Sequence, residues 1–194
     1  MRIALLGWGS LLWEGGLDFD KYRDEWKFDG PQVQLEFSRI SMRRLGALTL
    51  VIDPEHGALT AVAWCLSRRR CVDDAICDLR CREETTLENI GRLVVPEMSP
   101  SVGGAPRNEA NADPMVTWAR NKNVGVVIWT ALKSNFMSKR KCPFSVPAAI
   151  SYLNTLPPEG KVKAAEYVWR APAFVQTPLR EALQQEPWFA VSAK

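Results

Sequence analysis

Short apolar runs separated by turn residues predict several buried or half-buried β-strands. The first run covers residues 3–13, and a Gly-Trp-Gly-Ser sequence interrupts it, with glycines that allow backbone dihedrals closed to other residues. Residues 33–37 alternate between apolar and polar side chains, which is the period of a strand with one buried face. Further strands are predicted at 48–52, 59–66, 124–132 and 164–169. The strands at 48–52 and 59–66 are expected to form a hairpin.

Helical periodicity is clearest after residue 71. Two aspartates open this segment, where acidic groups favour the positive end of a helix dipole. Val72, Ile76 and Leu79 follow at helical spacing and predict a buried stripe. Four residues further, the stripe reaches Glu83, whereas Glu84 is rotated by about 100° toward solvent. A carboxylate on a buried stripe is uncommon unless it is paired or functional.

The second half of the chain is predicted to be mainly helical. Short helices are expected in 85–93, after the Asp-Pro sequence at 113–114, in 148–156 and in 178–185. Residues 96–113 are rich in Pro, Gly, Ala and Asn, and predict a long irregular loop. Because strands gather early and helices follow later, we expect an α+β fold in a single domain over 1–194.

Composition narrows the classes of partner. Hydrophobic residues make up 46% and charged residues 24%, and the net charge of +3 is too small to indicate a nucleic-acid partner. No apolar segment is long enough for a signal peptide or a membrane span, so no membrane partner is expected. Five cysteines without such a signal predict free thiols and a cytoplasmic location. With no Cys-x-x-Cys pair and a single histidine, no metal site is expected.

Two motifs in this order resemble the γ-glutamylcyclotransferase-like superfamily, and within it the ChaC-type proteins. Trp8-Gly9-Ser10-Leu11 resembles the family's Tyr-Gly-Ser-Leu turn after the first strand, and a tryptophan follows at position 13. Residues 41–46 loosely match a Ser-x-x-x-Arg-Gly segment that includes Arg44. Arg82-Glu83 matches the Arg-Glu pair that ends the family's central helix. The chain differs at Trp8, which stands where the family has tyrosine.

The resemblance implies a small mixed β-barrel flanked by helices and a cofactor-independent, metal-independent reaction. The γ-glutamyl group of a small peptide or amine cyclises and leaves as 5-oxoproline. Glu83 is the expected general base, and burial on an apolar helix face is expected to raise its pKa toward a useful range. Trp8, the Gly9-Ser10-Leu11 turn and Arg44 are the expected substrate contacts, with turn amides holding a carboxylate or developing oxyanion.

Other interpretations remain open on the sequence alone. The fold and its pocket are equally suited to a catalytically silent domain that binds a small ligand. Glu83 is then a structural carboxylate paired with Arg44, Arg82 or another cation. A serine hydrolase is disfavoured because nothing brings His56 to Ser10. Cys77 and Cys81 share one helix face, where we expect them to serve in packing. The sequence predicts no oligomeric state.

Overall fold

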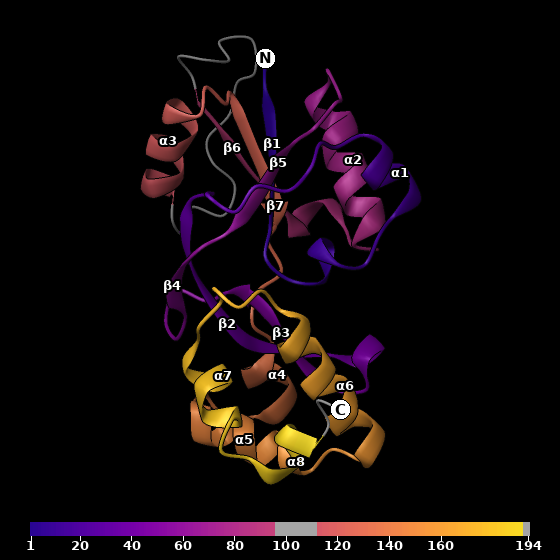
Figure 1. Ribbon diagram of the computed structural model, residues 1–194, viewed down its shortest axis with the longest axis vertical. Helices are drawn as coiled ribbons and strands as arrows, with labels where there is room; N and C mark the ends of the chain where they lie inside the picture. Colours follow the sequence, from indigo (N-terminus) through magenta and orange to yellow (C-terminus); the bar gives the residue numbers. More distant parts are fainter. Residues whose placement is uncertain (96–111, 192–194) are drawn as a thin grey trace. The chain divides into compact units, whose positions relative to one another are not determined.

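The structure is a computed structural model that describes residues 1–95 and 112–191. By contacts the chain divides into two compact units, each built from two separate stretches (Figure 1). Unit 1 contains Met1–Val33 and Ala61–Leu132, and unit 2 contains Gln34–Thr60 and Lys133–Lys194. Helices and strands are mixed along the chain, which confirms the predicted α+β class. The predicted loop at 96–113 lies outside the described residues, apart from the two residues that open a helix at 112.

Unit 1 is a four-stranded sheet with helices. Its strands are β1 (Ile3–Gly7), β5 (Ala63–Leu66), β6 (Ile90–Val94) and β7 (Val126–Thr130), in the order β5-β1-β7-β6. Its α-helices are α1 (Leu17–Lys21), α2 (Val72–Arg82) and α3 (Ala112–Asn121), and 3₁₀ turns cover Ser10–Leu12 (η1) and Leu87–Asn89 (η3). β1 runs parallel to β7 and antiparallel to β5, and β6 runs antiparallel to β7.

Both faces of this sheet are buried, which explains the nearly continuous apolar runs in its strands. Figure 1 shows α1 and α2 on one side of the sheet and α3 on the other. Ile3 and Leu5 of β1 belong to the core cluster that includes the α2 stripe. Ala4 and Leu6, whose side chains alternate with these, are buried as well. The α2 stripe therefore packs in the same core cluster as β1, mainly against β7 and β6 of the sheet, and the end of α2 is held in a defined place.

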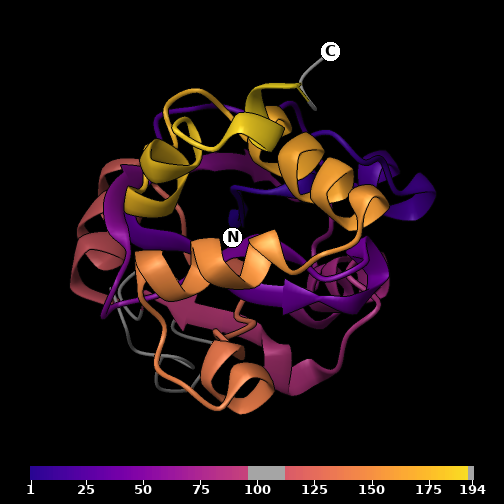
Figure 2. The same ribbon diagram turned by 90° about the horizontal axis from the view of Figure 1, so that it is seen from below.

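Unit 2 combines a three-stranded sheet with five helices. Its strands are β2 (Gln32–Ser41), β3 (Ala47–Ile52) and β4 (Ala58–Ala61), in the order β3-β2-β4, and the 3₁₀ turn η2 covers Met42–Arg44. The helices are α4 (Phe136–Arg140), α5 (Val146–Asn154), α6 (Pro158–Arg170), α7 (Pro178–Leu183) and α8 (Pro187–Val191). Figure 2 shows these helices, orange to yellow, around the purple strands.

Two strand predictions are wrong in their details. The single strand predicted at 59–66 is two strands, β4 and β5, which belong to different sheets. The chain changes sheets at Val62, whose backbone exchanges hydrogen bonds with Gly30 and Pro31. The predicted hairpin of β3 and β4 is also absent from the described sheet, because β2 lies between them.

Two element types are also corrected. The predicted helix at 85–93 is only the short η3, and the chain then forms β6, which pairs with β7 along its whole length. The predicted strand at 164–169 is the second half of α6. Ala164, Ala165 and Val168 are buried at helical spacing, and Pro158 begins this helix rather than ending the preceding one.

In the described residues the strands form two separate sheets rather than one closed barrel. The same part of the chain contains no helix that is long and apolar enough to cross a membrane.

Candidate functional site

The turn after β1 is one turn of 3₁₀ helix, Ser10–Leu12. The Glu14 N–H donates to the Ser10 carbonyl oxygen at 2.8 Å and closes the turn. Gly9 has a φ of −123° and a ψ of −140°, and neither Gly9 nor Gly7 has a positive φ. Gly7 is needed for space, because a Cβ there would lie 2.9 Å from the Trp26 ring.

Two predicted substrate contacts in this turn have buried side chains. Trp8 is 6% exposed and Leu11 is 7% exposed, and both belong to the hydrophobic core. Ser10 is only partly buried. Ser10 is therefore the partly exposed residue of the turn, and Trp8 and Leu11 hold the turn in the core.

Glu83 is the residue that follows the last turn of α2. It caps the helix in right-handed helical geometry, and its N–H donates to the Leu79 carbonyl oxygen at 2.9 Å. Its side chain is 16% exposed, so the carboxylate is mostly buried but reaches the surface. Glu84 has a φ of +48° and is exposed, which ends the helix and turns the chain away. The carboxylate thus continues the buried stripe although the helix itself stops at Arg82.

Arg82 joins the two predicted halves of the site. Its Nη1 donates to Glu83 Oε1 at 3.0 Å. Its Nη2 donates to the carbonyl oxygens of Ser10 at 2.9 Å and Glu14 at 2.7 Å. The Arg82 side chain is only 8% exposed, so these bonds form away from bulk water, where charged hydrogen bonds are strong. One guanidinium therefore connects the Glu83 carboxylate with the backbone of the Ser10 turn.

Arg44, the remaining predicted contact, belongs to unit 2. It ends η2, and its guanidinium carbon lies 4.9 Å from the centre of the Tyr167 ring, a cation–π geometry. Leu45 and Gly46 follow with φ values of 51° and 89°, so the loop turns through two left-handed residues. The role of Arg44 as a substrate contact stays a prediction.

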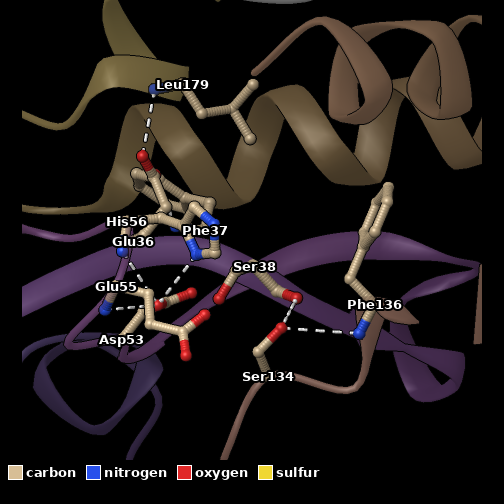
Figure 3. A network of polar contacts seen from close by, with 9 residues as sticks. All are labelled: Glu36, Phe37, Ser38, Asp53, Glu55, His56, Ser134, Phe136 and Leu179. Carbon is tan, nitrogen blue, oxygen red and sulfur yellow. Dashed lines mark hydrogen bonds and ion pairs between the residues drawn. The ribbon is translucent and has the colours of Figure 1, made fainter. Parts of the chain in front are cut away.

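A second polar cluster, which the sequence does not predict, surrounds Glu36 in unit 2 (Figure 3). Glu36 is fully buried, and its Oε1 accepts from the Phe37 N–H at 2.7 Å and the Thr177 hydroxyl at 2.6 Å. Its Oε2 accepts from the Leu179 N–H at 3.2 Å. Burial raises the pKa of Glu36, and the nearby negative charge of Asp53 adds to the rise, while these donors oppose it.

Asp53 organises the turn that follows β3. Its Oδ1 accepts from the backbone N–H groups of Glu55 and His56, and it lies 3.2 Å from Nδ1 of His56. Its Oδ2 is buried without a hydrogen-bond partner in the described structure, as is the Ser38 hydroxyl oxygen. In Figure 3 both side chains lie between β2 and the Asp53–His56 turn. The Asp53 carboxylate thus bonds within its own turn, whereas the Glu36 carboxylate ties β2 to the start of α7.

The alternation of residues 33–37 predicts that Glu36 faces solvent, so the sequence does not identify it as a buried residue. The structure instead buries residues 35 to 38 in succession, and the β2–β3 register shifts between Glu36 and Arg39. An irregularity of this kind re-aims side chains. The one sequence feature that could have indicated this polar cluster is Asp53, since an Asp before a Pro-containing turn often accepts hydrogen bonds from its own backbone.

Most protein metal sites need three or more ligands, and the cysteines and acidic groups of the described residues are the candidates for them. In residues 1–95 and 112–191, no group of three or more His, Cys, Asp or Glu side chains is placed to hold a metal ion. Cys65 is buried, and burial raises the pKa of its thiol to about 12, so it is unsuited to nucleophilic chemistry. Cys77 and Cys81 are exposed, so the prediction that they serve in packing is wrong.

Comparison with protein-family models, curated proteins and solved structures yields no match to this chain. The resemblance to the γ-glutamylcyclotransferase-like superfamily therefore depends on the sequence motifs alone.

Proposed function

We propose that the protein is a γ-glutamylcyclotransferase-like enzyme that releases 5-oxoproline from a small γ-glutamyl peptide or amine. The observation that carries the proposal is the Arg82 bridge, which holds the Glu83 carboxylate beside the Gly9-Ser10-Leu11 turn. These are the two motifs that the family resemblance assigns to the general base and to substrate binding. They are separated by about seventy positions in the chain and meet through one guanidinium.

The proposed reaction balances without a cofactor. The Glu83 carboxylate takes a proton from the α-ammonium group of the substrate. The freed amine attacks the γ-carbonyl carbon, and the bond from that carbon to the leaving nitrogen breaks as the ring closes. The ring nitrogen gives up its second proton as the ring closes, and this proton and the one held by Glu83 both pass to the leaving nitrogen, which departs as an ammonium ion. Because nucleophile and electrophile belong to one molecule, the enzyme's task is to hold the γ-glutamyl chain in a folded geometry.

Arg82 is a positioning residue in this proposal. Its Nη1 binds one oxygen of the Glu83 carboxylate while its Nη2 binds the backbone of the turn, which orients the carboxylate relative to the turn. The family's small barrel and a cytoplasmic location remain parts of the prediction that do not carry this argument.

The experiment is an assay of purified protein for 5-oxoproline against a panel of γ-glutamyl peptides and γ-glutamylamines. We expect release from at least one compound, and loss of release in Glu83→Gln with a cooperative melting transition retained. Glu84→Gln is the matched control, since this neighbouring carboxylate is exposed and points away. Absence of product from the whole panel, or equal loss in both variants, contradicts the enzyme proposal.

A second candidate is a catalytically silent domain that binds the same class of ligand. Two observations favour it: Trp8 lacks the hydroxyl of the family's tyrosine, and Glu83 is ion-paired as a structural carboxylate would be. Titration calorimetry with the same γ-glutamyl panel separates the two candidates. Binding without 5-oxoproline release supports the silent domain, and neither binding nor release contradicts both.

A further inference from the structure

Helix α2 carries two exposed thiols on one face. Cys77 and Cys81 are four residues apart within the continuous helix, and both side chains are exposed and unoxidised. Residues four apart on a helix have Cβ atoms about 5–6 Å from each other. Cys71 is also exposed, but it lies at the N-cap of the helix, away from this face. The chain thus offers one paired and one isolated surface thiol on the same element.

The pair is too widely spaced for a disulfide. A disulfide needs Cβ atoms about 3.5–4.5 Å apart, and the regular helix holds them further apart than that. The helix is not free to adjust, because Ala75, Ile76 and Leu79 bury its opposite face. Asp78, between the cysteines, also accepts two hydrogen bonds from Arg69, at 2.8 and 2.9 Å. The two thiols therefore remain free groups at a fixed separation.

We propose that Cys77 and Cys81 form a two-thiolate site for a cuprous ion. An ion bonded to both sulfurs spans the gap that a disulfide cannot. Binding forms two Cu–S bonds and releases two thiol protons to solvent, with no change in oxidation state. Thiolates are the soft ligands that Cu(I) selects, and Cu(I) accepts as few as two of them.

The surroundings of the pair favour this ion over zinc. Structural zinc takes four ligands in tetrahedral geometry, and the described residues place no third His, Cys, Asp or Glu with the pair. Arg80 Nη2 lies 3.5 Å from the Cys81 sulfur, so a positive charge stands beside a ligand that is anionic when it binds metal. The site is independent of the proposed γ-glutamyl chemistry and is tested without an activity measurement.

The test is an anaerobic competition for Cu(I) between the protein and a coloured bicinchoninate chelate, with ascorbate present. We expect the wild-type protein to remove one equivalent of Cu(I) from the chelate. Cys77→Ser and Cys81→Ser should each weaken binding by about 100-fold or more, since even an outer-shell partner of a metal site is worth 10–100-fold. Cys71→Ser is the matched control and should bind as the wild type does.

A second measurement excludes capture by unrelated thiols. X-ray absorption of the copper-loaded protein should show two sulfur neighbours and no nitrogen or oxygen neighbour. The proposal is overturned if wild-type protein fails to compete, if Cys71→Ser loses binding as the paired variants do, or if a third ligand is present. All three cysteines are exposed, so these variants are expected to fold, which circular dichroism checks directly.

Discussion

Replacing Arg82 with methionine removes a guanidinium that joins Glu83 to the Ser10 turn. Methionine fills much of the same volume but donates no hydrogen bond, so the carbonyl oxygens of Ser10 and Glu14 and the Glu83 carboxylate lose a charged donor. Removing one partner of a buried ion pair typically costs about 3–5 kcal/mol, because the other partner stays desolvated. The Arg82 side chain is 8% exposed and that of Glu83 is 16% exposed, so most of this cost should apply.

We therefore expect Arg82→Met to lower the free energy of unfolding by about 3–5 kcal/mol, a large part of the total for a typical domain. At this chain length, the melting temperature should fall by about 6–20 °C. Urea unfolding, followed by tryptophan fluorescence, measures the loss. Arg70→Met is the matched control, because Arg70 is exposed and its replacement should change stability by less than about 0.5 kcal/mol.

A double-mutant cycle with Glu83→Gln isolates the ion pair. Glu83→Gln alone should cost less than Arg82→Met, because Arg82 keeps both carbonyl partners. The two losses should be less than additive, since either change removes the same contact. A loss below about 1 kcal/mol for Arg82→Met, or a loss equal to that of Arg70→Met, would refute the buried bridge and the positioning role built on it.

Three further predictions test other parts of the structure. Gly91→Ala should destabilise unit 1 by about 1–3 kcal/mol, measured by urea unfolding, because its Cβ would overlap the buried ring of Trp129; a neutral result contradicts that packing. Glu36→Gln should remove a pH dependence. Because the pKa of Glu36 is raised, the folded protein binds more protons than the unfolded chain. The free energy of unfolding of the wild type, relative to that of the variant, should therefore fall as the pH rises from about 4.5 through the folded pKa. Urea unfolding measures both proteins across this range, and parallel pH profiles would contradict the prediction. Lys141 caps α4 at a φ of 60°, a left-handed conformation that strains a residue with a Cβ atom. Lys141→Gly should therefore stabilise the protein by about 0.5–1 kcal/mol and raise the melting temperature. A lower melting temperature would contradict this strain.

Helix α2 and its last residues illustrate what local pattern can predict. The stripe of Val72, Ile76 and Leu79 depends only on helical spacing, which is set by the backbone. The same spacing continues to Glu83, so the candidate base could be chosen without a structure. Arg82 as the bridge could not be predicted, because its partners in the Ser10 turn lie far away along the chain.

Residues 59–66 and 164–169 illustrate where pattern fails. An apolar run of six to eight residues suits a strand or a buried helical segment equally well. The 59–66 run is divided between two sheets by pairings with distant strands, and the 164–169 run is made helical by packing within unit 2. The prediction that Glu36 faces solvent is wrong for a similar reason, since the register shift in β2 directs this side chain into the interior.

By itself, the amino-acid sequence determined the α+β class, the buried α2 stripe and the placement of a carboxylate at its end. These depend on periodicity and on chemistry between near neighbours, which a linear pattern contains. Only the tertiary structure decided which strands pair, that β2 separates β3 from β4, and that Arg82 connects Glu83 with the turn after β1. Those outcomes depend on contacts between distant residues, whose free energies arise only when packing brings the side chains together and excludes water from between them.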